Sequence, residues 1–405
     1  MRRQSPTSFA VVDLGTASNK VLVTALSQGR LQYRAHAVRP SAGLKKGLVL
    51  NVATAAEALR QLIAQVETSN GQTIEKIVMS ITGGHIRGVV RQAGMTLHSR
   101  SRDITADDVR RVLDLAQNQP WPEDYSLLHV EQQEFALDRQ SGVHQSPIGM
   151  SASRLEARVF HIGAGAGAMQ NRVTAANHAG LAVAELMYAP LAAAEACLRH
   201  EEREMGVALV DIGAGCTSLI IYAHQAPQHV GVIPIGGDHY TNDLAISFHT
   251  PPADAERIKR AFGVVDAASA GDRTQIEFPG VGEQAQSTLS HRDLCDCLRS
   301  RAAEWLRLLE NDLDKSGWRH HLGAGLVLTG GGARLGGLLE LTQASLRLPV
   351  RLGIPALIEG APDELAAPEF AFLTGATFRS HSFHVRQPAP PSRWARILQK
   401  LDALD

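Results

Sequence analysis

Three short passages repeat one pattern of hydrophobic and polar positions. Each has an apolar, β-branched run, then a glycine-rich turn, then a second apolar segment, at residues 9–26, 207–222 and 324–341. In the first two passages an Asp stands at the bend, and this pattern predicts a β-hairpin. The third passage predicts a strand that ends in a glycine loop and opens a helix.

Helical spacing fills the intervals between these passages. Apolar residues recur every three or four positions within residues 53–67, 103–117, 170–181 and 297–317. Strands and helices therefore alternate along the chain, which predicts an α/β fold. The strand–Asp–glycine unit occurs twice, so we also expect two similar halves that face each other.

The composition fits a soluble globular protein of two or more subdomains. Of 405 residues, 44% are hydrophobic and 20% are charged, with 40 Lys and Arg against 41 Asp and Glu. The chain therefore has no overall excess of positive charge that would attract nucleic acid, so we expect no nucleic acid among the partners. No apolar run reaches the roughly 18 residues of a membrane-spanning helix, and the basic start has no signal-peptide cleavage site. Four cysteines without paired spacing support neither a zinc site nor a disulfide framework.

The first hairpin has the chemistry of a phosphate loop. A tight bend at Gly15 and Thr16 leaves backbone N–H groups free to bind an anion, and phosphate is the natural guest. Asp13 precedes the bend, where it can hold Mg²⁺ through water. Lys20 can supply a positive charge to the phosphate.

The second hairpin repeats this arrangement with Asp211, Gly213 and Gly215. A single Asp-x-Gly loop is more often a structural turn, but two copies in matching context favour a clamp for a polyphosphate and its metal ion. In the third passage the glycines would let the backbone approach a purine base or sugar closely. An ordinary strand–helix loop is the alternative there. The glycines concerned are Gly330, Gly331 and Gly332.

In this order, the three passages resemble the phosphate 1, phosphate 2 and adenosine motifs of the actin, Hsp70 and sugar-kinase superfamily. The resemblance covers nearly the whole chain and implies an actin-like fold, with two ribonuclease-H-like domains around a cleft for ATP and Mg²⁺. It assigns the nucleotide to the residues named above and the metal ion to Asp13 and Asp211.

Residues 79–97, 127–138 and 146–162 resemble the inserted 1C subdomain of the FtsA family, which actin and MreB lack. The family implies a self-associating protein that anchors FtsZ filaments to the cytoplasmic face of the bacterial inner membrane at the division septum. It also implies recruitment of later division proteins through subdomain 1C. The implied divisions are 1A at 6–82 and 163–203, 1C at 83–162, 2A at 204–245 and 306–370, 2B at 246–305, a return to 1A at 371–385, a linker at 386–392 and a membrane-targeting amphipathic helix at 393–405.

Residues 249–263 resemble an FtsA segment that carries a Glu and a Lys near the nucleoside, which assigns Glu256 and Lys259 to the nucleotide site. A solvated ion pair on a helix is the alternative. Actin-like proteins that hydrolyse ATP rapidly carry a Gln or Glu that orients the attacking water, and this chain has Ala189 at the corresponding position. The chain also departs from its relatives after the second hairpin's glycines, where Cys216 is followed by Thr and Ser. We therefore expect at most a weak ATPase, in which only Asp211 is a possible catalytic residue.

The end of the chain predicts an amphipathic helix that lies in a membrane interface. A Pro-rich stretch, 386–392, precedes it and argues for its independence, although docking on the protein's own core is the alternative. Because acidic residues weaken lipid attraction, one copy should bind anionic lipid only marginally. The residues expected at the membrane are Arg393, Trp394, Arg396, Ile397, Leu398, Lys400, Leu401 and Leu404.

The resemblance places the FtsZ contact in subdomain 2B. FtsZ ends in a segment of apolar and acidic residues, so its receptor should offer an apolar groove with a basic rim. Arg301 aligns with a basic residue that FtsA uses in this contact, while a solvated helix face is the alternative. The residues expected there are Arg301, Arg299 and Arg292 on the rim, and Leu294, Leu298 and Trp305 in the groove.

Two other functions remain open from the sequence. A small-molecule or sugar kinase of the same superfamily would need an Asp base that faces an acceptor hydroxyl, and no acidic residue stands in such a context. A pilus-assembly ATPase of the FtsA-like type would not need the amphipathic tail. An Hsp70-type chaperone is not expected, because little sequence follows the nucleotide fold for a peptide-binding domain.

Overall fold

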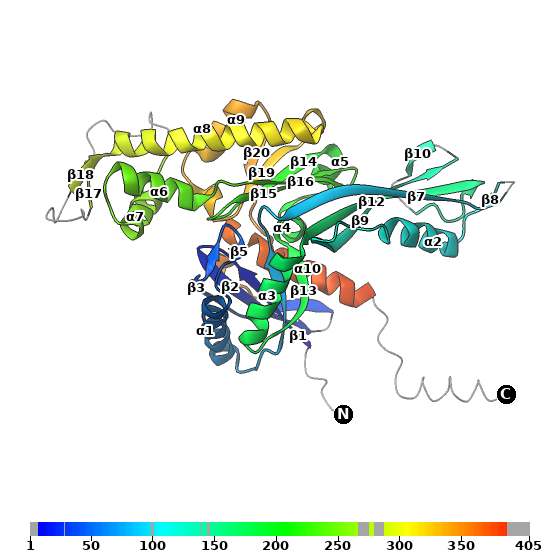
Figure 1. Cartoon of the computed structure of the whole chain (residues 1–405), viewed down its shortest axis with the longest axis horizontal. Coiled ribbons are helices and arrows are strands. Elements are labelled where there is room, and N and C mark those ends of the chain that lie inside the picture. Colours follow the sequence, from blue (N-terminus) through cyan, green and yellow to red (C-terminus); the bar gives the residue numbers. More distant parts are fainter. Residues whose placement is uncertain are drawn as a thin grey trace.

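The computed structural model describes residues 7–27, 29–98, 101–138, 140–143, 146–265, 275–278 and 287–386. Two five-stranded sheets with flanking helices form two lobes, and an elongated insert extends from one end of the molecule (Figure 1). The membrane helix predicted at 393–405 and its linker after Arg386 lie outside the described residues. Within the described residues, no helix has the length and apolar character needed to cross a bilayer.

The first lobe is built on a sheet whose central strand, β1, is buried on both faces. Val12 packs under helices α1 and α3, whereas the adjacent Val11 packs under α4 and α10. Side chains alternate across a strand, so one continuous apolar run serves both cores. The strands, in sheet order, are β13 (Ala182–Tyr188), β6 (Lys76–Ile81), β1 (Thr7–Leu14), β2 (Ser18–Ser27) and β3 (Arg30–Pro40), and the helices are α1 (Val52–Asn70), α3 (Ala166–His178), α4 (Ala189–Cys197) and α10 (Ala371–Arg386).

The second lobe repeats this topology. In each sheet a hairpin continues into a third antiparallel strand on one side, and two parallel strands follow on the other. The prediction of two similar halves is therefore confirmed. The strands, in sheet order, are β20 (Val350–Leu352), β19 (Gly325–Thr329), β14 (Val207–Ile212), β15 (Thr217–Ala223) and β16 (Ala226–Ile233).

Four helices and a small hairpin complete the second lobe. Its core lies between the sheet and α8, which is 26 residues long and is capped by the Ser290 side chain. The third sequence passage forms β19 and then a 3-10 turn at Gly331–Arg334, so the expected helix begins only at Leu338. The elements are α6 (Gly237–Ser247), α7 (Pro252–Phe262), β17 (Gln275–Phe278), β18 (Ser287–Ser290), α8 (His291–Ser316) and α9 (Leu338–Leu346).

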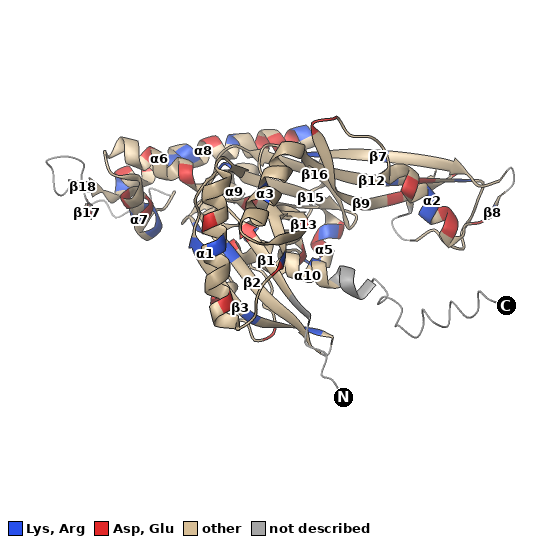
Figure 2. Cartoon of the chain, turned by 60° about the horizontal axis from the view of Figure 1, so that its bottom comes forward, with Lys and Arg blue, Asp and Glu red and all other residues tan. Residues whose placement is uncertain are grey.

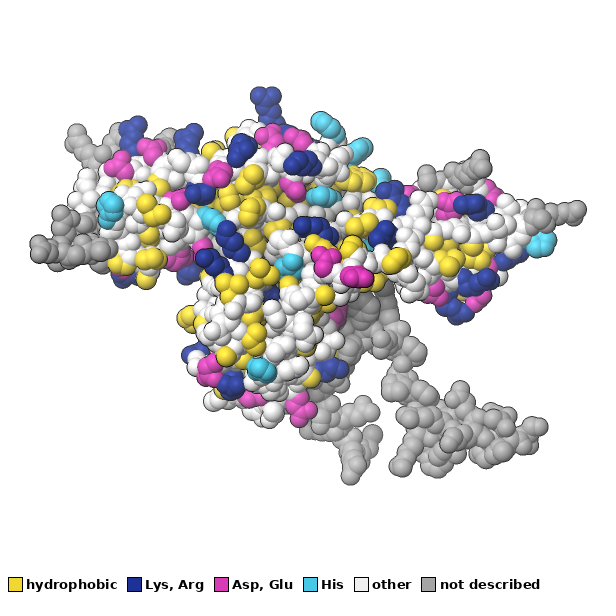
Figure 3. Space-filling model, in the orientation of Figure 1, with side chains coloured by type: hydrophobic (Ala, Val, Ile, Leu, Met, Phe, Trp, Pro, Cys, Tyr) yellow, Lys and Arg dark blue, Asp and Glu magenta, His cyan; other side chains and the backbone are white. Residues whose placement is uncertain are grey.

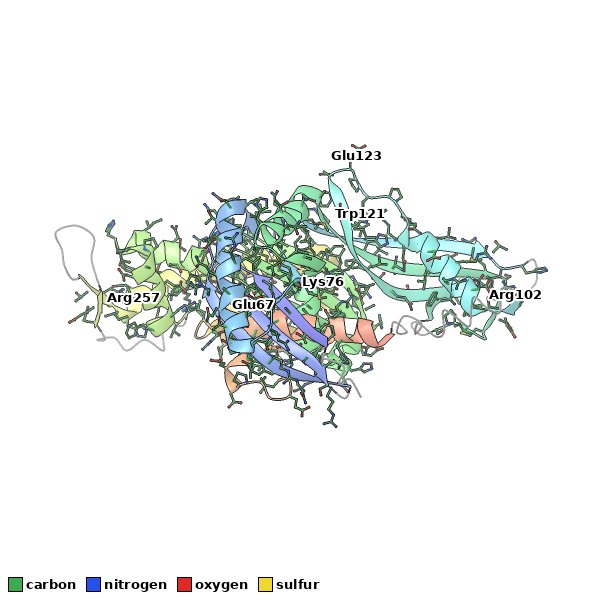
Figure 4. The ribbon with its side chains drawn as sticks, turned by 90° about the horizontal axis from the view of Figure 1, so that it is seen from below. Glu67, Lys76, Arg102, Trp121, Glu123 and Arg257 are labelled. Carbon is green, nitrogen blue, oxygen red and sulfur yellow. The ribbon has the colours of Figure 1, made fainter. Side chains whose placement is uncertain are left out.

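The insert is a separate four-stranded sheet with one helix. Its core lies under α2, whose first turn is closed by a capping box between Thr105 and Asp108. The long strand β12 runs from the insert into the core of the first lobe, where Ile162 is buried. Arg102 in the insert and Arg257 in α7 mark opposite ends of the molecule (Figure 4). In sheet order the strands are β10 (Gln140–Val143), β9 (Tyr125–Leu137), β12 (Arg154–Gly165) and β7 (Ile86–Thr96), with β8 (Arg102–Asp103), β11 (Ser151–Ala152) and α2 (Ala106–Gln117) beside them.

The helices α4 and α10 cross at backbone contact. A Cβ at Gly375 would collide with the carbonyl oxygen of Ala192, so only glycine fits there.

Basic, acidic and apolar side chains are mixed over the visible face of the molecule, and no single charge dominates it (Figure 3).

Candidate functional site

The first phosphate loop is a tight hairpin bend between β1 and β2. Asp13 and Lys20 face each other in the strand register, and Lys20 Nζ lies 3.0 Å from Asp13 Oδ2. A Cβ at Gly15 would lie 2.7 Å from the carbonyl oxygen of Ser18, so the bend requires glycine. The charge predicted for phosphate binding on Lys20 is thus shared with a carboxylate in this structure.

The second phosphate loop faces the first one. The Gly213 backbone N–H donates to the carbonyl of Cys216 at 3.0 Å and closes the bend. A Cβ on Gly215 would lie 2.8 Å from Thr16 Oγ1, so the two loops touch. The hydroxyls of Thr82 and Ser218 share a 2.6 Å hydrogen bond that also joins the two lobes. The structure therefore brings together the two loops that the sequence placed about two hundred residues apart.

A pair of carboxyl groups lies at this junction. Burial and the nearby Asp13 carboxylate together raise the pKa of Asp211 to about 7, although Lys20 opposes the change. Two carboxylates that are unfavourable together in the empty site gain by binding a divalent cation. Asp13 and Asp211 are therefore suited to hold Mg²⁺, which supplies charge neutralisation for a polyphosphate when it is bound.

The glycine loop after β19 packs directly on the second hairpin. Gly330 has a φ of 80°, and a Cβ there would collide with the Asp211 carboxylate. A Cβ on Gly332 would meet the side chain of Ile212. At Gly331, by contrast, a Cβ would lie 3.9 Å from Glu369 Cβ, which is an ordinary van der Waals contact. Of the three glycines, only Gly331 could therefore carry a Cβ without a clash.

Glu256 and Lys259 lie beside the second loop, on α7. Lys259 Nζ contacts Glu256 Oε2 at 2.6 Å and donates to the carbonyl of Gly237 at 2.9 Å, where α6 begins. The i, i+3 ion pair of the alternative is therefore present, but it is partly buried, with 13% of the Lys259 side chain and 34% of the Glu256 side chain exposed. A Cβ on Gly237 would lie 3.4 Å from Lys259 Nζ. The pair is held at the edge of the loops, and its contact with a nucleoside remains a prediction.

Sequence reasoning missed Arg172, a fully buried arginine on α3. Its guanidinium donates to three carbonyls: Leu14 at 3.2 Å, Ser80 at 2.9 Å and Gly47 at 2.8 Å. Burial lowers the pKa of Arg172 to about 10, while Asp13 opposes that change. Its position three residues before the buried Ala175 was the available signal, because it places the arginine on the apolar face of its helix. Arg172 joins the first phosphate loop to two other segments.

The position expected to orient water is buried and apolar. Ala189 is the first residue of α4 and is 4% exposed, within the core beneath that helix. A methyl group cannot hydrogen-bond water, which agrees with the expectation of slow turnover. Cys216, the departure in the second loop, is also buried.

The predicted groove on α8 is wrong. Leu294, Leu298 and Trp305 are buried to within 1% exposure and form the core against the sheet, where Trp305 Nε1 donates to Thr217 Oγ1 at 3.0 Å. Their spacing marked the inward face of α8 and not an open surface. Arg301 does lie at the surface and binds Asp243 through two hydrogen bonds of 2.6 and 2.8 Å. Figure 2 shows acidic and basic side chains following one another along this helix.

The expected membrane residues all lie outside the part of the chain that the structure describes. They are Arg393, Trp394, Arg396, Ile397, Leu398, Lys400, Leu401 and Leu404.

Comparisons with known proteins agree with this architecture. The profile described as "Cell division protein FtsA" matches residues 208–375, and that of the "SHS2 domain inserted in FTSA" matches residues 83–162. The chain is 35% identical over 373 residues to the cell division protein FtsA of Pseudomonas aeruginosa, which covers 92% of this chain and 89% of that protein.

Solved structures resemble the fold at lower identity. The PilM–PilN type IV pilus biogenesis complex contains a chain with a TM-score of 0.63 and 19% identity, covering 93% of this chain and 99% of that one. MreB5 of Spiroplasma citri, solved with bound ADP, has a TM-score of 0.55 and 12% identity, covering 93% and 97%. The predicted actin-like α/β fold with an inserted subdomain is confirmed.

Proposed function

The chain belongs to the FtsA family of bacterial cell division proteins, and from that premise we propose that it binds Mg²⁺–ATP and anchors FtsZ filaments to the cytoplasmic face of the inner membrane at the septum. As a family member it acts in cell division, with division proteins and copies of itself as partners. The observation that carries the nucleotide part is the meeting of both phosphate loops at Thr16 and Gly215, next to the carboxyl pair. The family relationship favours this function over the kinase and pilus alternatives.

In the proposed site each motif has a distinct task. Backbone N–H groups at Gly15, Thr16, Gly213 and Gly215 bind the phosphates, and Lys20 adds a positive charge. Asp13 and Asp211 hold the metal ion. Nucleoside recognition falls to the loop at Gly330, Gly331 and Gly332, together with Glu256 and Lys259 on α7.

Calorimetric titration of the full chain with Mg²⁺–ATP tests the nucleotide site. We expect Asp13→Ala to abolish binding by removing a metal ligand. Gly331→Leu should also abolish binding, because its side chain would occupy the position proposed for the base. Gly167→Leu is the control, since a Cβ there meets no atom within 4 Å. If Gly331→Leu binds ATP as the wild type does, the proposed base position is wrong.

Hydrolysis should be slow because Ala189 cannot orient water. We expect phosphate release far below the median enzyme rate of about 10 s⁻¹. A turnover near that rate would mean that another group in the cleft positions the attacking water, and the assignment of the cleft would need revision.

We propose that the terminal segment 393–405 binds anionic lipid through its apolar stripe and its basic residues. Co-sedimentation of the full chain with vesicles that contain anionic lipid tests this. Trp394→Glu should release the protein, because a carboxylate is costly to bury beside lipid. Retention of the Trp394→Glu protein on the vesicles would remove the segment from the membrane contact.

The FtsZ contact is proposed at the surface around Arg301. Its apolar part is now assigned to Ile246, which is 64% exposed and lies one helical turn after Asp243 on α6. An acidic FtsZ tail would compete with Asp243 for the Arg301 guanidinium. Arg301→Glu should weaken binding of a labelled FtsZ tail peptide by about 2 kcal/mol if the pair is desolvated. Arg299 is exposed nearby and is expected to contribute less.

The double exchange Asp243→Arg with Arg301→Glu separates binding from stability. It restores an ion pair between α6 and α8 but leaves the charge at position 301 reversed, so peptide binding should stay weak while the melting temperature recovers. Arg307→Glu, an exposed charge reversal on the same helix, is the control. If the double exchange restores peptide affinity, Arg301 acts only through the fold.

We propose that the insert at residues 83–162 contacts later division proteins, and that copies of the chain associate into a filament. Sedimentation of the full chain with and without ATP and lipid tests self-association. A protein that stays monomeric under all these conditions would refute the filament part of the proposal.

A further inference from the structure

A short hairpin between the first lobe's sheet and α1 has an unusual residue at its tip. Strands β4 (Leu44–Lys45) and β5 (Leu48–Val49) are joined by the two-residue turn Lys46–Gly47. Both turn residues have positive φ values, 49° for Lys46 and 77° for Gly47. Two-residue turns of this kind strongly favour Asn or Asp followed by Gly.

Lysine is a poor residue for the first position of such a turn. In the left-handed region the Cβ of an L-residue crowds the next carbonyl, and Asn relieves this with a local hydrogen bond. Backbone strain of this kind is concentrated at functional sites, where the side chain has a task that compensates it. The task of Lys46 follows from where the turn lies.

The turn is held against both phosphate loops. The Gly47 N–H donates to Thr16 Oγ1 at 3.2 Å, and Arg172 donates to the Gly47 carbonyl at 2.8 Å. From the opposite lobe, a Cβ on Gly215 would lie 2.7 Å from Lys46 Cα. Lys46 therefore stands where the first and second loops meet. The glycine loop for the base packs on Asp211 and so lies on the other side of the second bend.

The charge of Lys46 is also uncommitted. The side chains of Lys20 and Lys259 are only 12% and 13% exposed, and they bind the carboxylates of Asp13 and Glu256. Lys46 is exposed, and within the described parts of the chain no carboxylate pairs with it. Burial raises the pKa of the Cys216 thiol to about 11, and the positive charge of Lys46 opposes this change. The ammonium group of Lys46 therefore lies close enough to act on the second loop.

We propose that Lys46 binds the terminal phosphate of a nucleoside triphosphate, so that the hairpin at residues 44–49 distinguishes a triphosphate from a diphosphate. This rests on the proposed nucleotide site. The base lies at the Gly331 end and the phosphate chain runs toward Thr16 and Gly215. The last phosphate of the chain is then the group that comes within reach of Lys46, where an ammonium group acts as a point charge on phosphate oxygens.

Calorimetric titration of the full chain with Mg²⁺–ATP and Mg²⁺–ADP tests the assignment. Lys46→Asn removes the charge and supplies the residue that the turn prefers, so the variant should melt at or above the wild-type temperature. Its ATP affinity should fall about tenfold or more, the loss expected for one charge-assisted contact, while ADP affinity changes less than about threefold. Lys46→Arg should retain most of the ATP affinity.

Lys45→Asn is the matched control, since Lys45 is an exposed lysine of the same hairpin. The inference is overturned if Lys46→Asn binds ATP within about twofold of the wild type, loses ATP and ADP equally, or behaves as Lys45→Asn does. Failure of the wild type to bind either nucleotide would refute the proposed nucleotide site and this assignment with it.

Discussion

Replacing Arg172 with Met tests whether the buried Arg172 guanidinium stabilises the first phosphate loop. The guanidinium donates to carbonyls at the end of β1, at the end of β6 and in the Lys46–Gly47 turn. Met fills a similar volume but donates no hydrogen bond, so all three carbonyls lose their bonds to Arg172 inside the protein. The segments that they belong to would no longer be tied to α3.

The size of the effect follows from two opposing contributions. A hydrogen bond to a charged group contributes about 1.5–3 kcal/mol, so three of them contribute about 5–9 kcal/mol. The decrease of the Arg172 pKa from 12.5 to about 10 corresponds to about 3 kcal/mol of unfavourable charge burial, which the Met variant recovers. The expected net loss of folding free energy is about 3 kcal/mol. For a lobe of this size, that loss lowers the melting temperature by about 6–12 °C.

Thermal melting followed by circular dichroism, without nucleotide, measures this difference. Arg60→Met is the control, because Arg60 is exposed on α1 and donates to one carbonyl, that of His178 at the end of the same helix α3. The Arg60 variant should melt close to the wild type. A melting temperature of Arg172→Met within about 2 °C of the wild type would show that the three bonds do not support the loop.

Three further perturbations have defined outcomes. Gly215→Ala should weaken Mg²⁺–ATP binding in calorimetry, because its Cβ would lie 2.7 Å from Lys46 Cα and separate the loops, and unchanged affinity would contradict this. Asp211→Asn should raise the melting temperature of the nucleotide-free protein at pH 8. The pKa of Asp211 is raised from 3.8 to about 7 in the folded protein, so the free energy of unfolding decreases as the pH rises from about 4 to 7. At pH 8 the Asp211 carboxylate is ionised and buried, and Asn removes that charge. Burial lowers the pKa of His129 to about 3, and its Nε2 accepts from the Tyr188 N–H. Unfolded histidine takes up a proton below about 6.5, so stability should fall by about 2 kcal/mol between pH 6.5 and 5 in urea titrations. His129→Gln should flatten that slope.

The two hairpins and their duplication could be predicted from the sequence because their signals are local. An apolar strand, an Asp and a glycine bend occupy a few consecutive residues, and the same unit recurs near Asp13 and Asp211. The contact between the two loops is not local, but it follows from the symmetry of two facing halves. The family resemblance then supplied the insert, which no periodic pattern would have distinguished from the rest of the chain.

Two features could not be predicted because they depend on what packs against a helix. The apolar stripe of α8 has the same spacing whether it faces the protein's own sheet or a foreign peptide, and Trp305 proved to belong to the core. The spacing in α3 puts Arg172 on the apolar face, but it could not show what satisfies a buried guanidinium there, because the three carbonyls come from distant segments. Lys46 escaped notice because the conformation of its turn is visible only in the backbone angles.

The backbone contact between Gly375 and Ala192 has a mechanical consequence. The two helices cannot approach further at this point, so an opening of the cleft that keeps them in contact must turn about it as about a pivot. Arg386, where the described chain ends, is eleven residues beyond Gly375, which is about 16 Å along a helix. With so short a lever arm, a rotation of about 10° moves that end by at most about 3 Å. A segment attached to α10 at Arg386 would therefore move little if the proposed nucleotide cleft opened or closed about this contact.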